Sequence, residues 1–333
     1  MIDAFWNKLL SPGAAFDHPV TIALAAVVGG VLVATPVVIE LLRLVGRIDA
    51  PHRAELYRRL YSWLFLAPAI AAPVLLGPGC TILAIAGLSL LCYREFARAT
   101  GFFRERALSA TVAVGVLALT VAEYDHWYEF FVALPSLMIA LITIVALARD
   151  QPRGYLQRVS IATLSFLLFG VCFGHLAYMA NDADFRPIML TIVVCVEAND
   201  VFAYICGKSF GRRKLAPATS PGKTLGGVLG AAVLTPALFA LIGRWVFENQ
   251  SIGSLTHLVI MGLFASLAGM YGDLVISSIK RDLGIKDMGA LLPGHGGLLD
   301  RFDSLLLVSP AIFHYIGYFR GWGLDQPARI LTG

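Results

Sequence analysis

Ten long apolar blocks run through this chain of 333 residues and constrain its fold more than any other feature. A helix needs roughly 20 apolar residues to cross the hydrocarbon core of a bilayer, with about 17–25 tolerated. Hydrophobic residues make up 58% of the chain, and the mean hydropathy is +0.75. We therefore expect an all-α, polytopic integral membrane protein with about ten transmembrane helices. Their expected positions are 20–45, 61–77, 79–93, 107–122, 127–148, 159–179, 187–206, 224–246, 254–279 and 302–320.

The blocks follow one another without a linker, a low-complexity tract or a repeat, so we expect a single membrane domain over residues 1–333. Residues 1–180 would supply N-terminal helices, and residues 187–320 the catalytic helices and loops. The first block is too long for the core of a cleavable signal peptide and lacks a small-residue cleavage pattern. The second and third blocks are short and divided by Gly77-Pro78-Gly79, which leaves their boundaries weak. The five cysteines lie in or beside apolar blocks without metal-type spacing, which favours packing roles.

Basic residues are distributed unevenly between alternate loops. Of the 26 Lys and Arg residues, 21 fall on one side of the expected membrane, and the five others are Lys8, Arg186, Arg244, Arg320 and Arg329. Loops rich in Lys and Arg face the cytoplasm, so we expect the protein in the inner, cytoplasmic membrane with its basic loops inside. The net charge of +4 understates this basic face, which suits anionic lipid headgroups and nucleotides. No nucleic-acid partner is expected, and a homodimer is left open.

Charged residues are costly inside a membrane and usually functional, and two of the expected spans carry them in a helical pattern. The block 187–206 contains Glu197 and Asp200 three residues apart, on one helix face, with Asn199 beside them. In the block 254–279 and its continuation, one stripe is formed at i, i+4, i+7 and i+8 by Asp273, Ser277, Lys280 and Arg281. A structural polar cluster between helices is the alternative interpretation. A carboxylate placed so deeply needs a cation, and a metal ion is a good candidate.

Between these two spans lies "GKSFGRRKLAPATSPGKTLGG", residues 207–227. Glycine, proline, serine and five basic residues predict a flexible cationic loop. The segment "SPGKT" lacks the full spacing of a P-loop, which excludes that motif. The backbone N–H groups of Gly222 and Lys223 are nevertheless expected to open the next helix and to face a phosphate. An ordinary basic loop on the cytoplasmic side is the alternative.

The stretch "SSIKRDLGIKDMGALLPGHGGLLDRFDS", residues 277–304, concentrates charge in a chain whose charged residues amount to only 14%. Four cations in or beside it can neutralise phosphates: Lys280, Arg281, Lys286 and Arg301. Four carboxylates offer the hard oxygen ligands that hold Mg²⁺: Asp273, Asp287, Asp300 and Asp303. The glycines of "PGHGG" allow a tight turn and a close approach to a ligand. Together these features predict phosphoryl or nucleotidyl transfer, in which positioning and charge neutralisation supply most of the catalysis.

Residues 277–303 resemble the signature of the phosphatidate cytidylyltransferases, also called CDP-diacylglycerol synthases. The segment "ANDVFAYICGKSFGRRKLAPATSPGKT" resembles a second block of that family, so the resemblance covers at least residues 197–304. It implies the reaction of CTP with phosphatidate to give CDP-diacylglycerol and pyrophosphate, with Mg²⁺, on an all-helical membrane fold. One departure follows the Lys-Thr pair, where the family usually has Trp-Glu-Gly and this chain has Leu225, Gly226 and Gly227.

The resemblance also implies roles for individual residues. It makes Asp273 and Asp300 metal ligands. Around the nucleotide and lipid phosphates it places Lys280, Arg281, Lys286, Asp287, His295, Arg301 and Asp303. Substrate-binding roles are expected for Asn199, Asp200, Ser220, Lys223 and Thr224. A phosphate monoester is already largely ionised at neutral pH, so we expect His295 to bind phosphate or position the loop rather than act as a base.

Three other functions remain open from the sequence. A CTP-dependent lipid-alcohol kinase would share the nucleotide and the metal but would attack the γ-phosphorus and need a base. A paralogue of the cytidylyltransferases could use another phospholipid acceptor, for which the missing acidic side chain at Gly226 is a reason. A transporter would place polar groups through both halves of the membrane, whereas here they gather toward one side.

Overall fold

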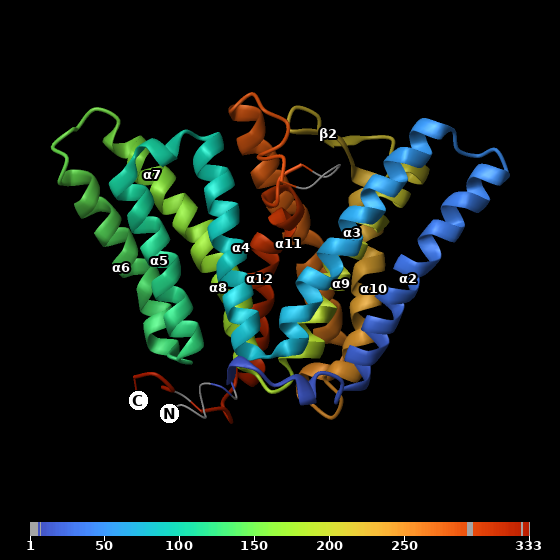
Figure 1. Ribbon diagram of the computed structural model, residues 1–333, viewed down its shortest axis with the longest axis horizontal. Helices are drawn as coiled ribbons and strands as arrows, with labels where there is room; N and C mark the ends of the chain where they lie inside the picture. Colours follow the sequence, from blue (N-terminus) through green and yellow to red (C-terminus); the bar gives the residue numbers. More distant parts are fainter. Residues whose placement is uncertain (1–5, 7, 292–295, 328, 333) are drawn as a thin grey trace.

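The computed structural model describes residues 6, 8–291, 296–327 and 329–332. Within these ranges, ten helical segments are long and apolar enough to cross a membrane, which confirms the all-α, polytopic fold (Figure 1). They are α2 (Pro19–Leu44), α3 (Ala50–Leu76), α4 (Pro78–Ala99), α5 (Arg106–Tyr124), α6 (Tyr128–Leu147), the segment Tyr155–Asn181, α9 (Phe185–Phe210), α10 (Leu225–Val246), α11 (Leu255–Asp282) and α12 (Leu299–Arg320).

The sixth segment is not a uniform α-helix. It consists of α7 (Tyr155–Ser165), a π-helical stretch η3 (Phe166–Cys172), α8 (Phe173–Tyr178) and a 3₁₀ turn η4 (Met179–Asn181). Three further 3₁₀ turns connect helices: η1 (Pro12–Ala14), η2 (Phe102–Arg104) and η5 (Ser251–Gly253). Hydropathy predicted this span at 159–179, within the observed Tyr155–Asn181, but it carries no information about a local change of helical pitch.

The helix α3 begins eleven residues before the apolar block that predicted it, because its first turns are charged rather than apolar. The side chain of Asp49 caps this start by accepting a hydrogen bond from the backbone N–H of His52 at 2.9 Å. Arg53 then forms an ion pair with Glu40 of α2 at 2.6 Å. The expected break at Gly77-Pro78-Gly79 is present, and Gly77 has a positive φ of 154° between α3 and α4.

The segment between α9 and α10 is a β-hairpin, where the sequence predicted a flexible loop. Strand β1 (Lys214–Ala216) pairs antiparallel with β2 (Ser220–Thr224). Gly222 and Lys223 therefore lie in a strand, and the expectation that their N–H groups open a helix is wrong. The helix α10 begins one residue later than the hairpin ends, with Thr224 as its cap accepting from the N–H of Gly227 at 3.2 Å.

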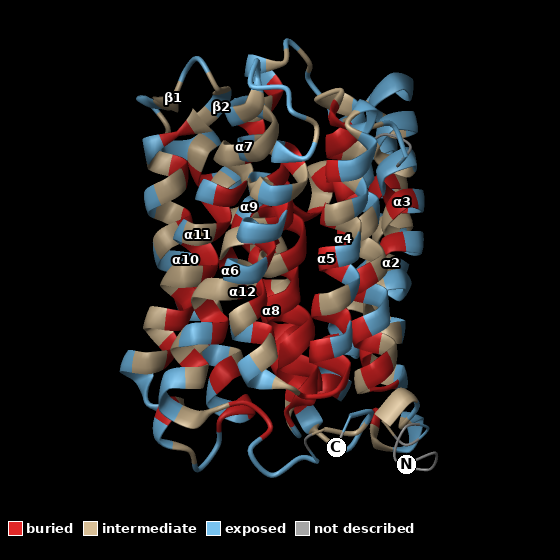
Figure 2. Ribbon diagram, turned by 90° about the vertical axis from the view of Figure 1, so that its left-hand side faces the viewer, coloured by how far each residue is buried: buried red, intermediate tan, exposed pale blue. Residues whose placement is uncertain are grey.

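The bundle has two chemically different ends. We call one the hairpin end, which carries β1, β2 and the connection from α11 to α12, and the other the terminal end, where both chain termini lie (Figure 1). Buried residues gather in the middle of the bundle and toward the terminal end, around α8 (Figure 2). The hairpin end is correspondingly more exposed, and it holds most of the residues that the sequence singled out.

Candidate active site

The helix α11 places Asp273 within the hairpin end of the bundle. One carboxylate oxygen of Asp273 accepts a hydrogen bond from the hydroxyl of Ser277 at 3.0 Å, one turn along the same helix. Its other oxygen lies 2.6 Å from Nζ of Lys223, which comes from strand β2. The hairpin therefore brings a cation to the intramembrane carboxylate, and two segments predicted separately form one site.

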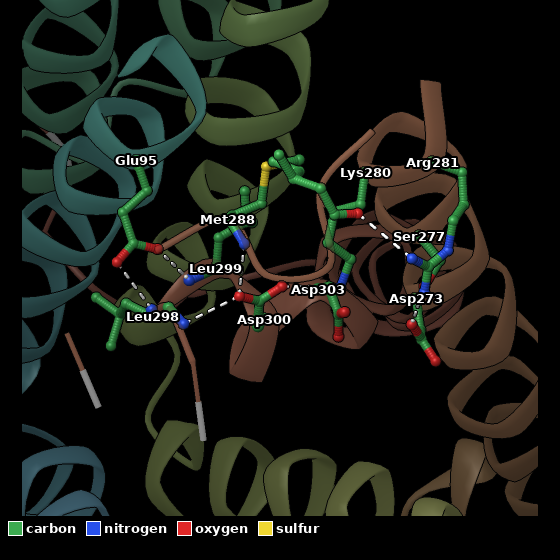
Figure 3. A network of polar contacts seen from close by, with 12 residues as sticks. Glu95, Asp273, Ser277, Lys280, Arg281, Met288, Leu298, Leu299, Asp300 and Asp303 are labelled. Atoms are coloured by element: carbon green, nitrogen blue, oxygen red, sulfur yellow. Dashed lines mark hydrogen bonds and ion pairs between the residues drawn. The ribbon is translucent and has the colours of Figure 1, made fainter. Parts of the chain in front are cut away.

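Asp300, in the first turn of α12, organises the connection from α11 to α12. Its Oδ1 accepts from Nζ of Lys280 at 2.8 Å, and both side chains are almost fully buried. Its Oδ2 accepts from the backbone N–H groups of Met288 and Gly297, each at 2.9 Å (Figure 3). One carboxylate thus ties together α11, the connecting loop and α12.

Arg301 extends from the next position of α12 toward α9. Its guanidinium donates to Oε2 of Glu197 at 2.7 Å and lies 5.1 Å from the ring centroid of Trp63 on α3. The intramembrane Glu197 therefore has a cationic partner, as its depth in the bundle requires. The contact also links α12 to two helices of the hairpin end that are distant in sequence.

Asp200 and Asp303 have no cation within 4.0 Å in the part of the chain that the structure describes. Asp303 is 6% exposed and accepts a hydrogen bond from the N–H of Ser304 at 2.7 Å. Both carboxylates lie within electrostatic range of Asp273. A buried carboxylate without a cation is costly, and this applies to Asp303, whereas Asp200 is exposed. The cluster of Asp200, Asp273 and Asp303 therefore has a charge excess that a bound cation would offset.

The predicted metal ligands Asp273 and Asp300 each face a lysine. Across the described ranges, no group of three or more His, Cys, Asp or Glu side chains is close enough to hold a metal ion alone. Mg²⁺ is usually held by one or two carboxylates together with substrate phosphates. The donor set therefore fits an ion that substrate phosphates complete, and the assignment of individual ligands stays a prediction.

Arg281, Lys286 and Asp287 are exposed at the hairpin end. The guanidinium of Arg281 donates to the backbone oxygen of Thr219 at 3.2 Å, which fastens α11 to the turn of the hairpin. Lys286 forms no ion pair within the described ranges, and Asp287 packs beside Gly296. His295 lies outside the described residues. Ser220 begins β2, and its predicted substrate contact stays untested.

Two of the predicted substrate-binding residues, Asn199 and Thr224, form hydrogen bonds to other residues of the chain. Asn199 is buried, and its side-chain oxygen accepts from the hydroxyl of Thr235 at 2.9 Å, which joins α9 to α10. Thr224 is also buried and caps α10. Their substrate-binding roles stay predictions, while both contacts hold in place the helices and the strand that carry Asp200 and Lys223.

The glycines after Thr224 have a packing reason. A Cβ atom on Gly226 would lie 2.7 Å from the backbone oxygen of Phe210, and one on Gly227 would lie 2.5 Å from that of Ala203. The start of α10 therefore packs directly on the backbone of α9. A glutamate at position 226, as the resemblance would place there, does not fit this contact.

An apolar cavity of about 880 Å³ reaches the first turn of α12. It lies between α3, α4, α9 and α12, and Arg58 and Tyr61 line it together with Leu298 and Phe302. This volume falls in the range of about 300–1,000 Å³ that is usual for ligand pockets. Leu298 and Phe302 border the cavity, and Asp300 and Arg301 lie between them in the chain. The first turn of α12 therefore both borders the cavity and carries two residues of the polar cluster.

Glu95 of α4 also belongs to this site, although no sequence pattern singles it out. Its carboxylate accepts from the backbone N–H groups of Leu298 and Leu299 at 3.0 and 2.9 Å (Figure 3). In the sequence it stands among arginines at the end of an apolar block, where charged residues are ordinary. Only the packing of α4 against α12 distinguishes it from those neighbours.

Comparison with known proteins places this geometry in context. A model of the cytidylyltransferase family matches residues 57–319. The chain is 31% identical over 281 residues to the uncharacterized protein YnbB of Escherichia coli (strain K12), covering 83% of this chain and 92% of that protein. It is 34% identical over 215 residues to the phosphatidate cytidylyltransferase of Bacillus subtilis (strain 168), covering 62% and 78%. It is 30% identical over 271 residues to the phosphatidate cytidylyltransferase of Rickettsia bellii (strain RML369-C), covering 80% and 94%.

Proposed function

Because this chain belongs to the cytidylyltransferase family, we propose that it is a phosphatidate cytidylyltransferase, which converts CTP and phosphatidate into CDP-diacylglycerol and pyrophosphate. The observation that carries this proposal is the first turn of α12, which borders the apolar cavity through Leu298 and Phe302 and carries Asp300 and Arg301 of the charged cluster. A lipid whose acyl chains occupy the cavity would hold its phosphate beside Lys280 and Arg301. The same cations would then face the phosphates of a nucleotide that enters from the hairpin end.

In the proposed reaction, an oxygen of the lipid phosphate attacks the α-phosphorus of CTP. The bond from that phosphorus to the oxygen bridging to the β-phosphate breaks, and pyrophosphate leaves with the bond's electron pair. The attacking phosphate is already largely ionised at neutral pH, so the site needs no strong base. Lys223, Lys280 and Arg301, now paired with carboxylates, supply positive charge to the phosphates.

We propose Mg²⁺ as the cofactor, held by carboxylates of the cluster Asp200, Asp273 and Asp303 and by substrate phosphates. The charge excess of this cluster supports the proposal, since Asp200 and Asp303 lack a cationic partner among the described side chains. Asp300 already accepts three hydrogen bonds, from Lys280 and from two backbone N–H groups, which leaves about one lone-pair site on its carboxylate for a metal. When bound, the ion neutralises charge on the attacking and leaving oxygens.

The decisive experiment is incubation of the purified protein with α-labelled CTP, Mg²⁺ and a panel of phospholipids in mixed micelles. The proposal expects a labelled CDP-lipid and pyrophosphate with phosphatidate, and loss of turnover when EDTA removes divalent cations. Formation of CDP and a phosphorylated lipid would identify a lipid-alcohol kinase instead. A labelled product only with another phospholipid would identify a different acceptor.

We further propose that the hairpin end faces the cytoplasm, where CTP is available, in the inner membrane. The basic loops gathered at this end support the orientation. Single cysteines beside Arg213 or Lys286 should be closed to an impermeant thiol reagent in intact cells. Cysteines beside Asp184 or Asn249, at the terminal end, should be open. Labelling beside Lys286 from outside would exclude this orientation.

A further inference from the structure

We propose that Glu95 is a positioning residue for the transfer reaction, which holds the first turn of α12 in the geometry that turnover requires. The inference rests on the proposed function, because it concerns the residues that this turn presents to the substrates. Glu95 contacts no other described ionised side chain within 4.0 Å. Its carboxylate instead binds backbone, through the N–H groups of Leu298 at 3.0 Å and of Leu299 at 2.9 Å.

These two N–H groups need a partner from outside their own helix. The first N–H groups of an α-helix have no acceptor within it, and Leu298, which precedes α12, provides no side-chain cap. Glu95 thus supplies from α4 the capping function that Ser, Thr, Asp or Asn usually supplies locally. Its negative charge also interacts favourably with the positive end of the α12 dipole.

Glycines in the signature loop make room for this carboxylate. A Cβ atom on Gly289 would lie 2.6 Å from Oε1 of Glu95, and one on Gly297 would lie 2.6 Å from Oε2. For Gly289 the three nearest atoms all belong to Glu95. The sequence predicted that the glycines of "PGHGG" allow close approach to a ligand. At Gly297, the last of them, and at Gly289, which precedes that segment, the neighbouring group is a side chain of the same protein.

The position of Glu95 also decides which groups can bind phosphate. Because its carboxylate occupies the N–H groups at the start of α12, these cannot bind a substrate phosphate as free helix starts often do. Phosphate binding is left to side chains that the anchored turn presents, such as Arg301, and to Lys280 through Asp300. Glu95 therefore acts on the reaction through α12, without touching the substrates.

Steady-state kinetics of Glu95 variants tests this role. We expect Glu95→Ala to lower kcat by roughly 10- to 100-fold per folded molecule, with a smaller change in KM for either substrate. Glu95→Gln keeps one accepting oxygen and should recover part of the loss. The matched control is Arg94→Gln, which alters an exposed charge on the same helix and should leave kcat within about twofold of the parent. Turnover of Glu95→Ala equal to that of the parent would overturn the proposal.

A double-mutant cycle separates positioning from a general loss of stability. Gly289→Ala should lower kcat in the parent, because its methyl group displaces Glu95, but should have little further effect in the Glu95→Ala background. Independent, additive losses would overturn the inference. Hydrogen exchange of the full protein gives a readout without substrates, and Glu95→Ala should speed exchange at Leu298 and Leu299. If the parent makes no CDP-lipid, the proposed function fails, while unchanged exchange in this variant would refute the anchoring itself.

Discussion

The two ends of the bundle pair their aspartates differently, although the terminal end also buries Glu123 without an ion pair among the described residues. At the terminal end, Asp182 accepts from Arg320 at 2.6 Å and from the N–H groups of Asp184 and Gly323. Asp125 there accepts from the backbone N–H of Leu331 and the hydroxyl of Thr332. At the hairpin end, by contrast, Asp200 and Asp303 have no cationic partner among the described residues.

We interpret this difference as follows: the charges at the terminal end stabilise the fold, whereas those at the hairpin end are the ones that we propose to bind a ligand. At the terminal end, the contact of Arg320 with Asp182 joins segments 138 residues apart, and that of Thr332 with Asp125 joins segments 207 residues apart. Both contacts pair protein groups with each other. The hairpin-end pairs also join distant segments, but they leave negative charge uncompensated beside Asp273 and exposed cations around it. Substitutions at the terminal end should therefore change stability, and those at the hairpin end should change turnover.

The largest effect is expected from Asp273→Asn. The change removes a full negative charge from the carboxylate cluster and from the partner of Lys223, while it keeps the shape of the side chain. We expect turnover to fall at least about 100-fold, or about 2.7 kcal/mol in the barrier, with normal behaviour in size-exclusion chromatography. Turnover within about tenfold of the parent would remove Asp273 from the reaction centre and would weaken the contrast between the two ends.

Arg281 tests whether exposed cations of the hairpin end contribute. Charge-assisted hydrogen bonds are typically worth about 1.5–3 kcal/mol, so we expect Arg281→Ala to lower kcat/KM for one substrate by roughly 10- to 100-fold. Arg281→Lys should retain part of the activity, since lysine keeps the charge but not the forked geometry. The measurement is kcat/KM for CTP and phosphatidate separately. If Arg281→Ala has the kcat/KM values of the parent, the role of Arg281 is limited to its hydrogen bond with Thr219.

Asp182→Ala tests the expectation that charges at the terminal end contribute to stability rather than to turnover. Removing one partner of a buried ion pair is destabilising, by about 3–5 kcal/mol in typical cases, and Asp182 also supports two backbone N–H groups. We expect the melting temperature of the purified protein to fall by several degrees, with turnover per folded molecule within about threefold of the parent. Asp184→Ala is the matched control, because this more exposed partner of Arg320 should matter less. A selective loss of turnover in Asp182→Ala would contradict the division of roles.

The smallest effect is expected in the pH dependence of stability. Burial lowers the pKa of Lys8 to about 8, although the nearby charge of Asp125 opposes the shift. In the unfolded chain this pKa is about 10.4, so between the two values the unfolded state binds more protons than the native state. Stability should therefore rise with pH through this interval. The melting temperature of the parent should increase, relative to that of Lys8→Met, when the pH is raised from about 7.5 to 9.5. Parallel pH profiles for the two proteins would exclude this contribution.

Much of the fold could be predicted because the membrane imposes one strong requirement on the sequence. Each span needs an apolar segment of suitable length, and the ten predicted blocks correspond to the ten spanning segments found within the described ranges. The predicted face shared by Asp273 and Ser277 is also present, because a helical repeat fixes it locally. The charged start of α3 was not predicted, because hydropathy detects apolar spans and not a polar helix.

The rest of the site depends on contacts between segments that sequence spacing does not relate. Lys223 reaches Asp273 because of the strand β2, which the composition of its segment did not predict. Glu95 meets Leu298 across 203 residues, and nothing near Glu95 in the sequence indicates which helix will lie against α4. Gly226 was recognised as a departure from the family pattern, but its cause, the backbone of Phe210, is visible only in the packed helices.

The glycine contact between α9 and α10 has a consequence for the evolution of this protein. A side chain regained at Gly226 would collide with the backbone of Phe210, and Gly227 is confined in the same way by Ala203. A single reversion to the acidic residue of the wider family would therefore require the end of α9 to move. A side chain at position 226 fits only where the end of α9 lies farther from α10, so its effect depends on the other residues that set the distance between these two helices.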